Sequence, residues 1–436
     1  MTKDPQSILA KSPMRPLQVA AVTLCVLLNA LDGFDVLAIS FASPGIASEW
    51  GIDRAALGLV LSMELIGMAI GSMLLGNIAD RAGRRPTVLG CLIIMATGMG
   101  LATVATSVVN LSIIRFVTGL GIGGMLACTN ALVAEFANDR HRNLAVAVMA
   151  AGYPMGAIIG GSIATGLLAQ GHWRDVFTFG ATVTALFLPI AWILLPESIG
   201  FLTQKRAPDA LERINRTLRR LGHESAATLP PPPERRAKPS IGALFSPDLA
   251  RGTVLLTISC FCHIMTFYFI LKWIPKIVVD MGYAPAKAGD VLVWANAGGL
   301  AGAMLLSFLT YVVGVRVLVI IAMLASTVMV SLFGQGQETL AGLAMIAAAA
   351  GFCTNAGVVG LYALFARVFP TAVRAGGTGF VIGIGRGGAA LGPIVAGLLF
   401  QAGVGLSHVA ILMAMGSLIG AGALLLLKER PVASPT

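Results

Sequence analysis

The sequence predicts an all-α membrane protein with twelve transmembrane helices in two pseudo-symmetric six-helix bundles. Three observations support this fold class: an apolar composition, twelve apolar stretches long enough to cross a bilayer, and a repeat that relates the first six stretches to the last six.

The composition excludes a set of soluble domains. Hydrophobic residues make up 56% of the 436 residues and charged residues only 11%, whereas soluble domains carry about 25% charged residues. The 52 glycines are typical of membrane helices that pack closely. The chain therefore has too few charges to cover a surface that faces water.

Six apolar stretches of about 20 residues, the length that spans a bilayer core, precede a long polar interval, and six follow it. The first six are expected at 17–43, 55–78, 87–106, 110–135, 143–169 and 175–195. The last six are expected at 252–279, 288–310, 315–333, 338–366, 374–400 and 406–427.

The polar interval predicts a cytoplasmic linker, partly helical and partly extended. It contains an amphipathic stretch from Ala210 to Leu221 and the run Pro230–Pro233. The predicted organisation is an N-terminal segment 1–16, a first bundle 17–195, the linker 196–251, a second bundle 252–427 and a tail 428–436.

The placement of the 30 Lys and Arg residues predicts that both termini are cytoplasmic, because positive charge concentrates on that side of a membrane. The same bias accounts for the net charge of +10 without a nucleic-acid partner. With the N-terminus inside, the basic residues outside are Arg54, Arg174, Lys276 and Lys287, and those within spans are Arg115, Lys272 and Arg386.

An internal repeat favours a secondary transporter over a channel or a membrane enzyme, since two parallel halves with a site at their interface are typical of transporters. A shift of 231 residues superposes Pro44 on Pro275, Gly51 on Gly282, Gly58 on Gly289, Gly67 on Gly298 and Gly71 on Gly302. One further residue of shift superposes Gly156 on Gly388 and Gly160 on Gly392.

Two motifs resemble signatures of the major facilitator superfamily. The turn after the second span reads GNIADRAGRRP (Gly76–Pro86), and the fourth span contains RFVTGLGIG (Arg115–Gly123). The resemblance covers nearly the whole chain. The matching loop of the second half, Tyr311–Arg316, has lost most of the first signature, and the fifth span lacks the Gly-Pro order of drug antiporters.

Three further stretches resemble the aromatic acid:proton symporters of that superfamily. They are DGFD (Asp32–Asp35) in span one, ARVFPTAVRAG (Ala366–Gly376) before span eleven, and GIGRGGAALGP (Gly383–Pro393) within it. The resemblance implies proton-coupled uptake of benzoate-, hydroxybenzoate- or phenylpropanoate-like anions for catabolism.

Asp32 and Asp35 are the first candidates for proton coupling. Charges inside a membrane are costly and usually mark ion or proton paths. Three residues apart, the two carboxylates share a helix face, and their repulsion raises the pKa of at least one. The alternative is that one is only a hydrogen-bond partner between helices.

Three other residues extend the proton-coupling set. Arg115 could pair with either aspartate or reach the membrane surface. His263, the repeat counterpart of Asp32, could relay a proton, contact substrate, or simply bond a neighbouring helix. Glu135 could form part of a proton path, or an ion pair at the inner gate with the nearby Arg140 or Arg142.

Arg386 is the first candidate for binding a substrate carboxylate, because its planar guanidinium matches that group with two hydrogen bonds. A permanent structural ion pair is the alternative. Phe34, Tyr153 and Trp273 are candidate walls for an aromatic ring. Lys272 could attract anions or reach the surface, and Glu64 could extend a proton path.

The predicted cytoplasmic gate consists of Asp80, Arg81, Arg84 and Arg85, whose charges could pair across the two halves when the inside is closed. The sequence contains no phosphate loop or nucleotide fingerprint. We therefore expect no ATP, metal or other cofactor, a proton gradient as the driving force, and a monomer in the cell membrane. The alternatives are a symporter for another organic anion or a sugar, an exporter, and an aromatic-acid sensor.

Overall fold

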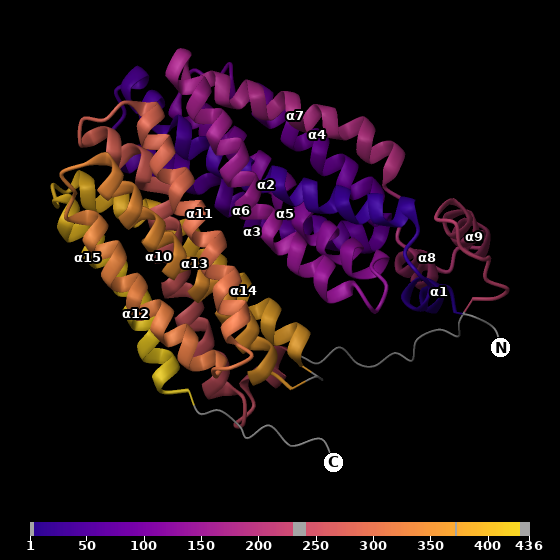
Figure 1. Ribbon diagram of the computed structural model, residues 1–436. Helices are drawn as coiled ribbons and strands as arrows, with labels where there is room; N and C mark the ends of the chain where they lie inside the picture. The colour runs from indigo at the N-terminus through magenta and orange to yellow at the C-terminus, as the bar shows by residue number, and fades with distance from the viewer. Residues whose placement is uncertain (1–3, 230–240, 371–372, 428–436) are drawn as a thin grey trace. The chain divides into compact units, whose positions relative to one another are not determined.

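The structure, a computed structural model, describes residues 4–229, 241–370 and 373–427, and every regular element in these ranges is a helix. Twelve of the helices described there are long and apolar enough to cross a membrane, which confirms the predicted spans (Figure 1). The first six are α2 (Pro16–Trp50), α3 (Arg54–Ala82), α4 (Arg84–Ala102), α5 (Val108–Phe136), α6 (Arg142–Gln170) and α7 (Trp173–Leu194). The last six are α10 (Ala250–Asp280), α11 (Pro285–Leu309), α12 (Val315–Gly334), α13 (Leu340–Val368), α14 (Arg374–Gln401) and α15 (Leu406–Leu425).

Short helices occupy the polar segments. They are α1 (Pro5–Lys11), α8 (Ile199–Lys205), α9 (Ala210–Arg220) and the 3-10 helix η1 (Ile241–Phe245). The proline run Pro230–Pro233 and the tail 428–436 lie outside the described residues.

Two repeat-related glycines end the first span of each half. Gly51 follows α2 with φ of 59°, and Gly282 follows α10 with φ of 96°. L-residues with a side chain rarely adopt such angles, so glycine is the residue that suits these turns. The sequence repeat therefore reflects the same local chain reversal in both halves.

The other repeated glycines perform matching packing roles. A Cβ on Gly67 would overlap the Phe116 carbonyl oxygen, so α3 lies directly against α5. Gly298 has the same relation to the Ala348 carbonyl, which places α11 against α13. Close backbone approach through small residues is the usual way in which membrane helices associate.

Two compact units emerge from the packing, and they do not follow the predicted bundle boundaries. The first unit contains residues 1–38, 66–160 and 171–235. The second contains 39–65, 161–170 and 236–436. The end of α2, the start of α3 and the end of α6 therefore pack with the later helices. The two six-helix bundles therefore remain a prediction.

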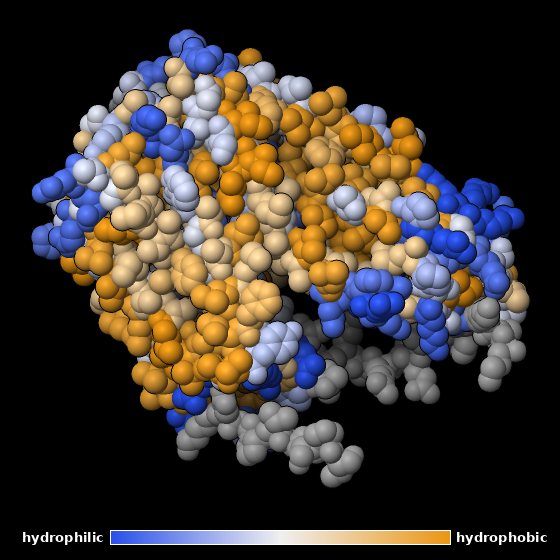
Figure 2. Space-filling model, in the orientation of Figure 1, coloured by the Kyte–Doolittle hydropathy of each residue, from blue (hydrophilic) through white to orange (hydrophobic). Residues whose placement is uncertain are grey.

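Large apolar side chains on the surface agree with a membrane environment. Trp192, Phe308 and Met345 are each more than 60% exposed, and Figure 2 shows hydrophobic residues over most of the visible helices with hydrophilic ones gathered toward their ends. Contiguous apolar surface of this kind is unfavourable in water and normal against lipid.

Candidate functional site

The two aspartates of the DGFD motif are fully buried on α2. Gly33 between them lets α2 approach α6, because a Cβ there would overlap the Tyr153 carbonyl oxygen. Gly156 on α6 likewise meets the Ala30 carbonyl. The glycines thus fix the depth and rotation of the helix face that carries Asp32 and Asp35.

Arg115 reaches this face from α5 and is also fully buried. Its Nη2 donates to the Asp35 backbone carbonyl at 2.8 Å, and its Nη1 approaches Met99 Sδ at 2.9 Å. Its guanidinium carbon lies 5.4 Å from the centroid of the Phe177 ring. The structure therefore places Arg115 inside the protein beside Asp35, rather than at the membrane surface.

Aromatic side chains border the same region of the first unit. Phe34 is buried and packs edge-to-face on Phe179 at 5.3 Å between centroids. Tyr153 is half-buried on α6. Phe34 and Tyr153 therefore come from the two helices that Gly33 brings together.

His263 lies on α10 with both ring nitrogens engaged. Nε2 is 2.9 Å from the Thr354 carbonyl oxygen, so this nitrogen carries the hydrogen, and Nδ1 then accepts from the Ser417 hydroxyl at 2.9 Å. Ser326 extends the chain of bonds to α12. This geometry suits a neutral histidine that ties helices together, the third of the alternatives expected from the sequence.

Arg386 is half-buried near the middle of α14. Gly385 and Gly387 on either side of it pack against Cys260 and Phe261 of α10. Trp273, another predicted wall residue, is fully buried and donates its Nε1–H to the Pro393 carbonyl at 3.2 Å. In this arrangement Trp273 packs α10 on α14.

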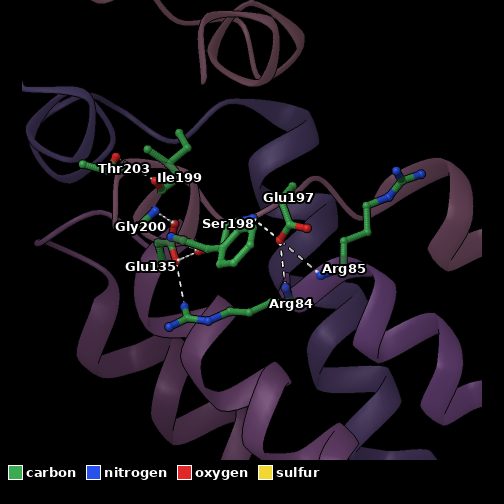
Figure 3. Close-up of polar contacts among 9 residues, drawn as sticks. Arg84, Arg85, Glu135, Glu197, Ser198, Ile199, Gly200 and Thr203 are labelled. Atoms are coloured by element: carbon green, nitrogen blue, oxygen red, sulfur yellow. Dashed lines mark hydrogen bonds and ion pairs between the residues drawn. The ribbon is translucent and has the colours of Figure 1, made fainter. Parts of the chain in front are cut away.

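Glu135 is the centre of a polar network at the end of α5 (Figure 3). It accepts hydrogen bonds from Arg84 Nη1 at 2.8 Å, the Ser198 hydroxyl at 2.6 Å and the Gly200 N–H at 2.7 Å. The sequence predicted Arg140 or Arg142 as its partner, but Arg142 pairs with Asp139. Glu135 therefore joins α5, the start of α4 and the start of α8.

Glu197 is a functional candidate that the sequence analysis missed. Its Oε1 accepts from the backbone N–H groups of Arg84, Arg85 and Ser198 at 2.8–3.2 Å (Figure 3). A carboxylate at a helix N-terminus satisfies free N–H groups and interacts favourably with the helix dipole. The only sequence signal is an acidic residue directly after the sixth span.

The predicted gate residues thus differ in their surroundings. Arg84 and Arg85 are held within the first unit, and Arg85 Nη2 also donates to the Trp192 carbonyl at 2.7 Å. Asp80 and Arg81 are exposed at the end of α3. A role in gating stays a prediction for all four.

The model of the Major Facilitator Superfamily matches this chain over residues 25–307 and 256–436. A solved structure of a D-xylose-proton symporter superposes with a TM-score of 0.69 and 18% identity, covering 92% of this chain and 97% of that one. At this identity the likeness shows the fold alone.

Curated relatives extend over almost the full length. A gallate transporter of Pseudomonas putida is 31% identical over 422 residues, covering 95% of this chain and 92% of that protein. A 4-hydroxybenzoate transporter, PcaK, of the same species is 31% identical and covers 89% and 88%. These relatives are aromatic acid permeases and not enzymes, as the motifs predicted.

Proposed function

Because this chain belongs to the major facilitator superfamily, we propose that it imports an aromatic carboxylate together with protons by alternating access. The observation that carries the coupling is the pair of fully buried carboxylates, Asp32 and Asp35, on one face of α2, with buried Arg115 bonded to the Asp35 backbone carbonyl. The relatives named as gallate and 4-hydroxybenzoate transporters support the substrate class.

The proposed topology places both termini in the cytoplasm of a cell whose membrane the chain spans. The distribution of Lys and Arg supports this orientation. The end of α2, the start of α3 and the end of α10 then lie on the extracellular side. We propose a monomer that needs no cofactor and is driven by the proton gradient.

Proton loading would take place on Asp32 or Asp35. Both carboxyls are buried in a membrane span, where a charge is costly and marks an ion or proton path. One of them would take up a proton from outside and release it inside. Any movement of Arg115 relative to α2 would change the surroundings of Asp35, and this links protonation to conformation.

The substrate anion would bind Arg386, because a planar guanidinium holds a carboxylate with two hydrogen bonds. Phe34 and Tyr153 stay candidates for contact with an aromatic ring. His263 would support the site by holding α10, α13 and α15 together, and Trp273 by packing α10 on α14.

Release to the cytoplasm would follow opening of the inner gate. In this proposal Asp80 and Arg81 form the gate at the end of α3. The bond of Arg84 to Glu135 and the bond of Arg85 to the Trp192 carbonyl hold the start of α4 in place. Binding of the anion and the proton together leaves less uncompensated charge, so the loaded carrier can change conformation more readily than the half-loaded one.

The test separates proton-driven accumulation from simple exchange. In proteoliposomes, Asp32→Asn and Asp35→Asn should each reduce accumulation of labelled 4-hydroxybenzoate under a proton gradient, and at least one should abolish it while retaining exchange of labelled for unlabelled substrate. Asp290→Asn is the matched control, because Asp290 lies half-exposed beside Lys287. Full accumulation by both aspartate variants would refute the coupling role.

Arg386→Ala tests the anion site separately. Binding of the acid should fall far more than binding of an uncharged analogue such as the corresponding amide. Equal losses for both ligands would identify Arg386 as structural.

A further inference from the structure

An ion pair within the second compact unit joins α3 to α10. Lys272 Nζ lies 3.6 Å from Glu64 Oε2, and both side chains are completely buried. Two charges withdrawn from water are costly even when paired. A lysine near a span end normally extends to the membrane surface, so its inward placement here requires the carboxylate of another helix.

The pair lies well inside the two helices. Glu64 is ten residues after Arg54, the start of α3, and Lys272 is eight residues before Asp280, the end of α10. At a rise of about 1.5 Å per residue, the pair lies roughly 12–15 Å from these helix ends. Both ends are extracellular in the proposed topology.

A layer of contacts on the outer side of the ion pair joins the ends of α3, α10 and α14. Gly58 of α3 approaches the Pro393 carbonyl of α14, and Gly397 approaches the Arg54 carbonyl. At the outer ends, Arg54 Nη2 pairs with Asp280 Oδ2 at 3.1 Å, where both side chains are partly exposed. The buried Glu64–Lys272 pair lies further along both helices than this exposed pair.

We propose that Glu64–Lys272 is the innermost lock of an extracellular gate made by α3, α10 and α14. This inference rests on the topology and alternating access of the proposed function. When the outer helix ends separate, the pair must break, and water entering from outside hydrates both charges. Opening loses the attraction between the two charges, but it also removes the cost of keeping both charges away from water. Because these two changes oppose each other, the closed and open states stay close in free energy.

The proposal predicts an unusual pattern among variants. Glu64→Gln leaves Lys272 buried without its carboxylate, so the closed state should lose more than the open one. The double variant Glu64→Gln/Lys272→Met removes both charges, so its closed state should be as populated as in the parent protein. The exchange Glu64→Lys/Lys272→Glu should restore the lock.

A cysteine that replaces Thr165 reports the outer opening. Thr165 is buried near the end of α6, its methyl group lies beside Gly289 of α11, and both belong to the second unit. The rate of reaction with a membrane-impermeant maleimide is measured in right-side-out and inside-out vesicles, without substrate or gradient. The chain without the Thr165 change gives the background of its own cysteines.

Glu64→Gln should raise labelling from the outside about tenfold or more, whereas the double variant and the exchange should stay within about threefold of the parent. Lys272→Met provides the same readout if Glu64→Gln does not fold. Arg54→Gln/Asp280→Asn is the matched control and should change labelling less than twofold, since exposed pairs contribute little.

The proposed lock would be refuted if Glu64→Gln and Lys272→Met were both labelled at the rate of the parent. Fast labelling of the exchange variant Glu64→Lys/Lys272→Glu would also refute it. Labelling only in inside-out vesicles would refute the proposed topology and, with it, the extracellular position of the lock. Failure to carry an aromatic acid would not affect this assay, so the two proposals fail separately.

Discussion

Gly33→Ala should damage transport although it changes none of the charged residues. The added Cβ would overlap the Tyr153 carbonyl oxygen. An ordinary contact of this kind is about 3.3–3.6 Å, so α2 and α6 must separate by roughly 1.5 Å. Overpacking of this sort costs about 1–3 kcal/mol, and the better helix propensity of alanine returns at most about 1 kcal/mol.

The functional loss should exceed the loss of stability, because Asp32 and Asp35 flank the displaced position. Displacements of about 1 Å at a functional site can reduce rates about a hundredfold. We expect Gly33→Ala to lower proton-driven uptake at least about tenfold, with a lower thermal unfolding midpoint in detergent.

Gly90→Ala on α4 is the matched control. No atom lies within 4 Å of the position that its Cβ would occupy, so alanine should preserve or raise the unfolding midpoint and leave uptake unchanged. Wild-type uptake by Gly33→Ala, or equal losses for both variants, would refute the idea that close helix approach positions the aspartates.

Three further predictions concern the polar networks. Glu135→Gln should cost about 2 kcal/mol of stability, since a charged acceptor of three hydrogen bonds is lost. The double variant Glu135→Gln/Arg84→Gln should lose less stability than the two single variants added together, and additive losses would show that the two residues do not interact. Ser417→Ala should cost about 1–2 kcal/mol by removing the hydroxyl that bonds His263, with an unchanged pH dependence of uptake; a shifted dependence would make His263 a proton relay. Burial, and next the charge of Arg15, lower the pKa of His223 from 6.5. The folded state should therefore be most stable above pH 6.5 and lose stability as the pH falls and the ring becomes charged, although Nε2–H donates to Gln18 Oε1 in both forms. The unfolding midpoint of the parent should then fall more than that of His223→Gln between pH 7.5 and 5.5, and parallel curves would contradict this.

The twelve spans could be predicted because their signal is local. Membrane helices need a continuous apolar stretch of known length, and the observed bounds differ from the expected ones mainly at helix ends. The largest difference is α2, which continues through Pro44 to Trp50, because an interior proline is tolerated when neighbouring helices satisfy the freed backbone groups. The repeat could also be predicted, since Gly51 and Gly282 have the same backbone requirement.

The partners of the charged residues could not be predicted, because they come from other helices. Spacing favoured Arg140 or Arg142 for Glu135, but the tertiary structure supplies Arg84. From its position in the sequence, Lys272 could extend to the membrane surface. Only the packing of α3 against α10 places Glu64 beside it. Glu197 was missed because capping of α4 by a distant carboxylate leaves no local pattern.

The central claim is proton-driven uptake of an aromatic acid, and the most direct test uses the unmodified protein. Proteoliposomes loaded at neutral pH are diluted into acidic buffer that contains labelled gallate, 4-hydroxybenzoate, benzoate or a phenylpropanoate. We predict accumulation of at least one acid above its external concentration, and loss of that accumulation when a protonophore is added. Accumulation that survives the protonophore, or tight binding without any accumulation, would contradict the account.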